Sequence, residues 1–361
     1  MSNGSNFLGA GGMEYHLVDV TGQLKERGVK VGFAVRKGTF LERELLAGEP
    51  DVFPLTCTGI RKVISWFQLL RAIVRFKPDI ISVNRERDVV QTYLTVKLYN
   101  ILFKKKAKVM SVFHNIGWKF PFNIDWLDGA IFPNLYIKNE YIHSQNTNHL
   151  QRVIYHGINI DKFFYKNNNE IDRARKFFVG KSGPIIGMVG EFRKNQIELV
   201  DVAIYLRAKT DKFTFALVGR GSDEEIETLN KKIRLNNLEN NFIITGNVHR
   251  NKIPDIFYDL DISVTTYRLE AFGMVFIESL ASYTPLIAYN SGGPVEILAN
   301  GGGRLVDGGP QEMAEQIFRL ISDTELRCTM GIEARESAEQ YFSISAMGRQ
   351  HFDFYVELLR S

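Results

Sequence analysis

The sequence predicts an α/β protein built from two doubly wound, parallel-sheet domains in tandem. Its 361 residues exceed what one hydrophobic core usually supports, which favours two domains. Short β-branched runs alternate with amphipathic helical stretches, a pattern typical of strand-helix-strand units. This alternation stops near residue 167 and restarts at 185, so the second domain follows a linker.

The first domain is expected over residues 1–165. Before Gly11 and Gly12, where such a sheet normally has a strand leading into its glycine turn, the sequence is a polar stretch. We therefore expect the first strand to be missing, and favour a truncated or mis-assigned start. The clearest strands are 29–35, 80–83 and 109–113, separated by stretches long enough for crossover helices.

The second domain is expected over residues 182–342. A helix with many aromatic residues is expected at 346–360, and its apolar face predicts that the segment 343–361 docks rather than extends freely. The strands of the second domain are expected at 185–189, 214–218, 242–245, 262–265 and 286–288.

Composition excludes several classes of protein. The chain is 45% hydrophobic and 24% charged, as expected of a soluble globular protein. Cys57 and Cys328 are its two cysteines, so neither a disulfide framework nor a zinc site of clustered thiols is expected. With no secretory signal and no run of 18 apolar residues, we expect a cytoplasmic protein. No zinc-finger spacing or basic recognition helix indicates nucleic acid as a partner.

The segment 269–280 carries the most informative chemistry. Glu270 and Glu278 flank seven mostly apolar residues that run from a turn into a helix. The free N–H groups of that helix start would bind a diphosphate at Phe272, Gly273, Met274 and Val275. Glu278 would then accept hydrogen bonds from ribose hydroxyls. Read alone, the segment is equally compatible with an ordinary helix that carries a solvated glutamate.

The longer order VTTYRLEAFGMVFIESLASYTPLIAYNSGGPVEIL resembles the donor-site block of glycosyltransferase family 4, whose members are retaining GT-B enzymes. The resemblance implies two Rossmann-like domains facing across a cleft, with a C-terminal helix that crosses back to the first domain. It also implies that Glu270 contacts hydroxyls of the donor sugar, that the backbone of residues 273–275 binds the phosphates, and that Glu278 binds the ribose.

Other segments extend the resemblance over most of the chain. Gly11 and Gly12 match a Gly-Gly-x-Glu turn near the donor phosphate or the acceptor, and Gly219 matches a glycine turn beneath the nucleotide. The segment 155–163 matches one that leads toward the second domain, with His156 in place of the usual asparagine.

The segment 187–196, GMVGEFRKNQ, resembles the basic loop of the second domain, in which Gly190 and Lys194 align with the family pattern. Glu191 stands where the family usually has arginine, and Arg193 is our candidate to replace it. Cations here would stabilise the charge of a departing nucleoside diphosphate.

His114 follows a predicted strand at the position where the family often carries a histidine bordering the acceptor site. The carboxyl ends of parallel strands face the ligand in this architecture. We expect His114 to contact the primary hydroxyl of the sugar or to position the acceptor, with a structural histidine as an equally weighted alternative.

Two stretches bear on the acceptor, which we expect to be a saccharide or a lipid-linked saccharide. The amphipathic segment 60–77 and the aromatic segment 118–126 would suit a peripheral contact with an anionic membrane surface. The favoured alternative is that both pack on their own domain. The cluster of Lys104, Lys105, Lys106 and Lys108 would also suit an anionic surface, and the favoured alternative there is a solvated turn before a strand.

These features predict a retaining glycosyltransferase that uses a nucleoside-diphosphate sugar and needs no cofactor. No metal is expected, because Asp259 and Asp261 have the pattern of a strand entry rather than a metal motif. An enzyme alternative is a GT-B phosphorylase or epimerase. A non-enzymatic alternative is a degenerate partner subunit that binds a nucleotide sugar without turnover.

Overall fold

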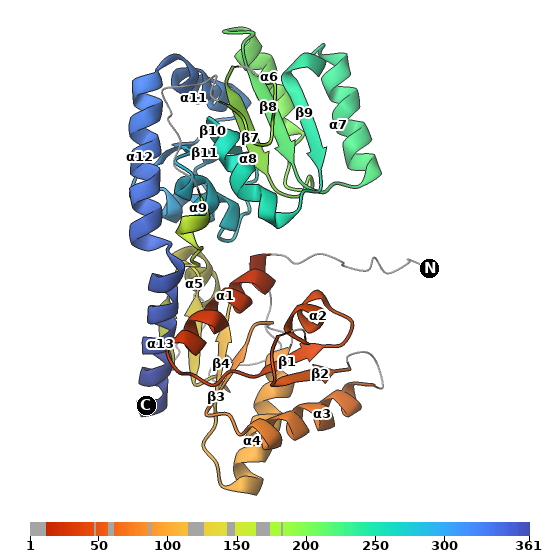
Figure 1. The fold of residues 1–361 in the computed structure, drawn as a ribbon, viewed down its shortest axis with the longest axis vertical. Helices are drawn as coiled ribbons and strands as arrows, with labels where there is room; N and C mark the ends of the chain where they lie inside the picture. Colours follow the sequence, from red (N-terminus) through yellow and green to blue (C-terminus); the bar gives the residue numbers. More distant parts are fainter. Residues whose placement is uncertain are drawn as a thin grey trace. The chain divides into compact units, whose positions relative to one another are not determined.

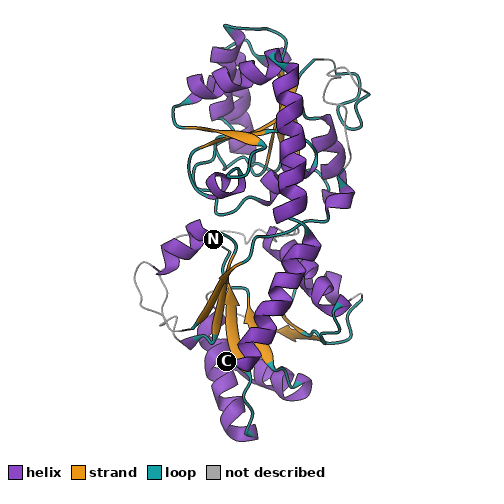
Figure 2. Cartoon of the chain, turned by 90° about the vertical axis from the view of Figure 1, so that its left-hand side faces the viewer, coloured by secondary structure: helices purple, strands orange, loops and turns teal. Residues whose placement is uncertain are grey.

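The computed structural model describes residues 12–46, 48–56, 61–85, 88–114, 126–142, 149–163, 174–181 and 183–361. The chain divides into two compact units. Unit 1 comprises Met1–Gly157 and Ile344–Ser361, and unit 2 comprises Ile158–Ser343. In each unit the strands form the interior and helices flank them (Figure 1, Figure 2). The domain limits of 165 and 182 that the sequence predicts stay a prediction.

Unit 1 contains two parallel sheets. One has four strands in the order β3-β4-β5-β6, and the other pairs β1 with β2. The elements are α1 (Gly12–Glu26), β1 (Phe33–Arg36), α2 (Phe40–Leu46), β2 (Val52–Leu55), α3 (Arg61–Phe76), β3 (Ile80–Val83), α4 (Val89–Phe103), β4 (Lys108–Val112), β5 (Gly129–Phe132), α5 (Leu135–Ile142), β6 (Leu150–Val153) and α13 (Ile344–Arg360).

The strand expected at 29–35 is partly wrong. The ladder between β1 and β2 begins only where Phe33 lies opposite Val52, so the preceding residues have no strand beside them. Val29 instead closes the end of α1, because its N–H donates to the carbonyl of Leu24 at 3.1 Å. The sequence pattern could not show this, because an apolar run does not reveal where its partner strand starts.

The core of unit 1 joins its first helix to its last. Val20 and Leu24 of α1 are buried in one cluster with Met347, Phe354 and Leu358 of α13. The helix expected at 346–360 is thus part of the core of unit 1. Within the described ranges no strand precedes α1, and the two sheets of unit 1 are separate; the missing first strand stays a prediction.

Unit 2 is a doubly wound domain around a six-stranded parallel sheet in the order β12-β11-β10-β7-β8-β9. The strand order reverses between β7 and β10, which is the topological switch point of this architecture. The elements are β7 (Ile185–Val189), α6 (Glu198–Arg207), β8 (Thr214–Val218), α7 (Asp223–Leu235), β9 (Phe242–Gly246), α8 (Ile253–Asp259), β10 (Ile262–Thr265), α9 (Met274–Ala281), β11 (Leu286–Tyr289), α10 (Gly293–Ile297), β12 (Gly303–Val306), α11 (Pro310–Ser322) and α12 (Thr324–Tyr341).

The α/β class with parallel sheets is confirmed, and the strands of unit 2 match the expected ranges to within one residue. Apolar runs of this kind are informative because the central strands β7, β8, β10 and β11 are buried on both faces. β12 was not expected, since only two of its four residues are apolar.

The segment expected as a linker is partly folded into unit 2, and its residues 164–173 lie outside the described ranges. Arg175 is buried and pairs with Asp261 at 3.2 Å. The buried carboxylate of Asp259 accepts hydrogen bonds from the consecutive N–H groups of residues 176–178, at 2.7–2.8 Å. The two aspartates therefore anchor the chain that enters β7, which explains their place at the start of β10.

In the ranges that the structure describes, no helix combines the length and the apolar character needed to cross a membrane.

Candidate active site

The candidate site lies in unit 2, at the carboxyl ends of the strands on either side of the switch point. Loops follow β7, β8, β10 and β11 at this edge of the sheet, and they carry the predicted residues of unit 2. The carboxyl ends of parallel strands lie at the same edge of the sheet, and α/β domains bind ligands in the crevice at the switch point of that edge.

Two glycines bring the loops after β7 and β8 into direct contact. The N–H of Gly190 donates to the carbonyl of Val218 at 2.8 Å. Gly219 has a φ of 149°, and a Cβ at this position would lie 1.8 Å from the carbonyl oxygen of Gly190. Any side chain at Gly219 would therefore separate the two turns. The structure brings these two predicted residues together.

The basic loop after β7 is held at both ends. The side-chain amide of Gln196 donates to the carbonyl of Gly190 at 2.7 Å. The hydroxyl of Thr266, which follows β10, donates to the carbonyl of Asn195 at 2.7 Å. These bonds hold the loop that carries Lys194 across the switch point.

Lys194 and Glu270 form an ion pair, with Nζ 2.5 Å from Oε2. Their side chains are 24% and 13% exposed, so the pair is partly shielded from water. The ammonium also lies 5.7 Å from the centre of the Tyr267 ring. A cation and a carboxylate from two different loops thus meet at the switch point, where each is able to contact a polar ligand.

The loop that carries Glu270 is shaped by the two glycines that open α10. The N–H of Gly293 donates to the carbonyl of Glu270 at 2.8 Å. A Cβ on Gly292 would lie 2.5 Å from the carbonyl oxygen of Glu270, and a Cβ on Gly293 would lie 2.4 Å from that of Phe272. The GGP segment is therefore a tight support for the Glu270 loop.

α9 begins directly after this loop. Gly273 is its N-cap, in the left-handed region with φ 93°, a conformation that glycine adopts without strain. Phe272 is buried, whereas Met274 and Val275 are half-buried in the first turn, whose N–H groups suit an anion. Glu278 lies in the second turn of the helix and is only 8% exposed.

Glu191 forms ion pairs with two arginines of the loops after β7 and β8. Its carboxylate lies 2.5 Å from Arg193 and 2.9 Å from Arg220. Partial burial opposes the charge of Glu191, but the two guanidinium groups hold its pKa below the ordinary value. Arg220 was missed in the sequence, although its place between Gly219 and Gly221 at the end of β8 was the available signal.

The sequence also does not predict a second polar network at the same edge of the sheet. The hydroxyl of Tyr289 donates to Glu198 at 2.7 Å, and Arg268 lies 3.3 Å from the same carboxylate. The Arg268 guanidinium stacks 3.5 Å from the centre of the Tyr289 ring. Burial and the bond to Glu198 raise the pKa of Tyr289. No local motif marks these residues, because Glu198 lies on α6, Arg268 in the loop after β10 and Tyr289 at the end of β11.

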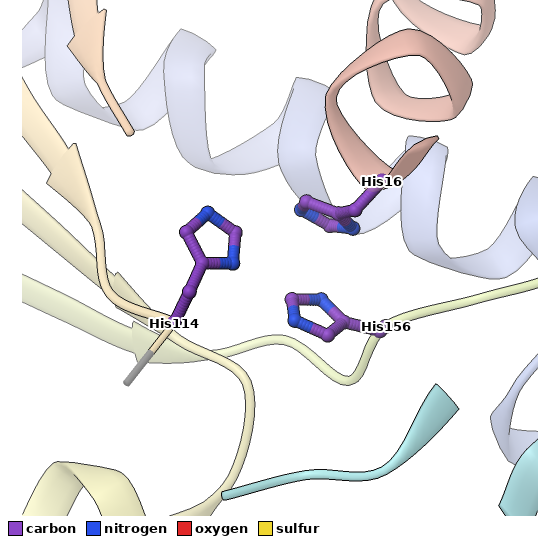
Figure 3. Close-up of side chains that lie close together, drawn as sticks. All are labelled: His16, His114 and His156. Atoms are coloured by element: carbon purple, nitrogen blue, oxygen red, sulfur yellow. The ribbon is translucent and has the colours of Figure 1, made fainter. Parts of the chain in front are cut away.

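His114 lies in unit 1, two residues after β4, and is 8% exposed. Its Nε2 lies 3.3 Å from Oδ1 of Asn84, which follows β3. Burial lowers its pKa to about 4, so the imidazole is neutral at neutral pH. His16 and His156 lie beside it (Figure 3).

The remaining predicted positions are only partly described. Gly11 lies outside the described residues, and Gly12 opens α1. Of the aromatic segment 118–126, only Trp126 is described; it is partly exposed and stacks on Tyr93 of α4 with ring centres 5.1 Å apart.

The fold and the site together define the class: an α/β protein with a glycine-lined, cation-bearing site at a sheet switch point. Comparison with known proteins gives the family. Residues 10–162 match Glycosyltransferase Family 4, and residues 170–337 match Glycosyl transferases group 1. The chain belongs to the GT-B glycosyltransferases of family 4, as the donor-site block predicted.

Individual relatives are similar to this chain in sequence or in fold. An uncharacterized glycosyltransferase of Methanocaldococcus jannaschii is 30% identical over 59% of this chain and 55% of its own length. This chain thus spans about half the length of that relative. A glycosyltransferase of Rickettsia africae has the same fold, with a TM-score of 0.82 at 22% identity over 98% of this chain and 97% of its own. Anabaena HepE, solved with UDP, has a TM-score of 0.80 at 19% identity over 96% of both chains.

Proposed function

We propose that this protein transfers a sugar from a nucleoside diphosphate to a hydroxyl of a saccharide or lipid-linked acceptor, with retention at the anomeric carbon. The observation that carries the proposal is the Lys194–Glu270 pair at the switch point of unit 2. A cation suits the diphosphate and a carboxylate suits the sugar hydroxyls. The cation would contact the phosphate side and the carboxylate the sugar side of the glycosidic bond that breaks.

In this proposal the first turn of α9 binds the diphosphate through its N–H groups, and Lys194 moves from Glu270 to a phosphate oxygen. Glu270 then accepts hydrogen bonds from the sugar, and Glu278 accepts those of the ribose. As the glycosidic bond breaks, Lys194 stabilises the charge that develops on the leaving phosphate. The acceptor attacks on the same face and gives its proton to that phosphate oxygen.

We propose further that donor activation depends on these side chains and not on a metal ion. The adjacent acids that come closest to a metal motif, Asp259 and Asp261, are already bound to backbone N–H groups and to Arg175. The leaving-group charge is instead assigned to Lys194 and to the arginines beside Glu191.

A lipid-linked acceptor fits an apolar surface on unit 1, which we call the α3/α4 surface. Its side chains project from two helices joined by a hydrogen bond from Gln91 to Ser65. Its exposed apolar members are Val63, Ile64, Trp66 and Phe67 of α3, and Leu94, Leu98, Ile101, Leu102 and Phe103 of α4.

Exposed cations adjoin this surface: Lys97 on α4, and Lys104, Lys105 and Lys106 at the end of that helix. Apolar side chains beside lysines complement an anionic lipid surface, which attracts the cations and buries the apolar groups. We therefore propose that unit 1 makes a peripheral membrane contact through the α3/α4 surface.

The experiment is a transfer assay with UDP-, GDP- and ADP-sugars and lipid extracts or saccharide acceptors, with the anomeric configuration of the product read by NMR. UDP-glucose comes first, because HepE was solved with it. Turnover with retention supports the proposal, whereas an inverted product contradicts it.

The alternative function is a partner subunit that binds a nucleotide sugar without turnover. Glu191 favours it, since this carboxylate pairs with both Arg193 and Arg220 and offsets part of their positive charge. Nucleotide binding by calorimetry in a folded sample, with no transfer from any donor, would select this alternative.

A further inference from the structure

Three buried histidines meet in unit 1. His16 comes from α1, His114 follows β4 and His156 follows β6. They are 1%, 8% and 6% exposed. Each residue has one ring nitrogen, Nδ1 or Nε2, that belongs to a set of three atoms within 4.8 Å of one another. Figure 3 shows the three imidazoles gathered around a common space.

The hydrogen bonding of His114 fixes which of its nitrogens is available. Its Nε2 lies 3.3 Å from Oδ1 of Asn84. An amide oxygen only accepts, so Nε2 carries the proton and Nδ1 keeps a lone pair. A polar second partner that sets the tautomer in this way is typical of histidines that bind metals.

Two buried ring nitrogens of these histidines lack an ordinary explanation. Nδ1 of His114 and Nδ1 of His16 are buried, and neither has a hydrogen-bond partner among the residues that the structure describes. Buried polar atoms are nearly always satisfied, because leaving one unpaired costs about 1–3 kcal/mol. A ligand that accepts electron pairs would satisfy both.

Ring packing alone does not account for the arrangement. The rings of His16 and His156 are 3.9 Å apart at their centres, a contact that phenyl rings or aliphatic groups would make without burying polar atoms. His351 offers a comparison within the same core: its ring lies 5.7 Å from that of His16, yet it is not part of the group of converging nitrogens.

We propose that His16, His114 and His156 bind one divalent transition-metal ion of the zinc class. Imidazole suits zinc, copper, nickel and iron, and the absence of a carboxylate or carbonyl ligand in the set disfavours magnesium and calcium. Small rotations of the side chains would bring each nitrogen to about 2.0–2.1 Å from the ion. Three protein ligands leave the fourth position to water.

The ion would link three segments that are distant in the sequence, namely α1 and the chain just beyond β4 and β6. Because it crosslinks elements of unit 1, it would stabilise the folded state of that unit. It plays no part in the donor chemistry proposed for Lys194 and Glu270, so nucleotide binding is expected with or without it.

The test uses the full chain without a polyhistidine tag, stripped with a chelator and titrated with Zn²⁺ in a calorimeter. We expect one equivalent of Zn²⁺ per chain, a rise in Tm, and visible d–d absorption of tetrahedral type when Co²⁺ is used. UDP binding to the stripped protein, measured in parallel, separates a failure of this proposal from a failure of the proposed function.

His156→Asn and His16→Gln each remove one ligand but keep a polar side chain, and each should weaken Zn²⁺ binding at least about tenfold. His249→Asn is the matched control, since His249 is exposed in unit 2 and Asn keeps a side chain able to cap the turn there. Its titration should match that of the unaltered chain.

The proposal is overturned if the stripped chain binds less than one equivalent, or if either ligand variant retains the affinity of the control. Circular dichroism shows whether each variant is folded. Should one ligand variant fail to fold, the other decides the result. If neither folds, the Zn²⁺ stoichiometry and Co²⁺ spectrum of the unaltered chain decide it.

Discussion

The ammonium of Lys194 lies 2.5 Å from the carboxylate of Glu270, although 75 residues separate them in the chain. The pair forms because the loops after β7 and β10 meet at the switch point of one parallel sheet. It holds both groups in a defined position before any ligand binds. The donor would have to exchange this ion pair for contacts of its own.

Lys194→Ala is expected to weaken UDP binding by about 1.5–3 kcal/mol, the usual contribution of a hydrogen bond to a charged group. Glu270→Gln should leave UDP binding equal or stronger, because it releases the ammonium, while sugar transfer falls. Isothermal calorimetry and transfer rates measure the two effects. Lys212→Ala, an exposed lysine of the same unit, is the control. Equal weakening by both site variants would indicate a purely structural pair.

Glu191→Gln should strengthen UDP binding by up to about 1 kcal/mol, the usual range for partly exposed charges. The change frees Arg193 and Arg220 from a carboxylate that they now share. The gain should shrink as salt is added, because exposed charges are screened. If the affinity is unchanged at low salt, neither arginine contacts the diphosphate.

Glu278→Gln tests the assignment of the ribose. The unaltered chain should bind UDP about 1.5–3 kcal/mol more tightly than 2′,3′-dideoxy-UDP, since the carboxylate accepts from the hydroxyls. In the variant this difference should largely disappear, which a double-mutant cycle measures directly. A difference that persists in the variant would place the ribose elsewhere.

Gly293→Ala should destabilise unit 2 by about 1–3 kcal/mol, since the added methyl group meets the carbonyl oxygen of Phe272 at 2.4 Å. The displaced Glu270 loop should also reduce donor turnover. Thermal unfolding and a transfer assay measure both. Gly309→Ala is the matched control, because a Cβ there has no atom within 4 Å among the described residues. Equal Tm values for the two variants would contradict the packing argument.

The double variant Ile101→Ser, Leu102→Ser should bind vesicles of anionic lipid at least about tenfold more weakly than the unaltered chain, since two apolar side chains lose their burial. Both side chains are more than half exposed in the α3/α4 surface. Ile332→Ser removes an exposed apolar side chain from unit 2 and should have no effect. Co-sedimentation with anionic and neutral vesicles makes the comparison, and equal binding by all three proteins would refute this surface.

Much of unit 2 could be predicted from the sequence. Strands 185–189, 214–218 and 262–265 have the expected bounds, because fully buried strands appear as continuous apolar runs. Unit 1 was less predictable. The sequence does not predict β2, β5 and β6, and it wrongly predicts strand at 29–32, since the pairing that decides these elements is not local.

The local segments of the sequence by themselves determined the α/β class and the family, and they predicted candidate site residues such as Lys194 and Glu270. Only the tertiary structure decided which of them meet. Arg220 reaches Glu191 because the parallel strands β7 and β8 end at one edge of a sheet. Tyr289 reaches Glu198 of α6, and His114 and His156 meet His16 of α1, because helices pack beside these strand ends. Such contacts depend on strand order, which no short stretch of sequence encodes.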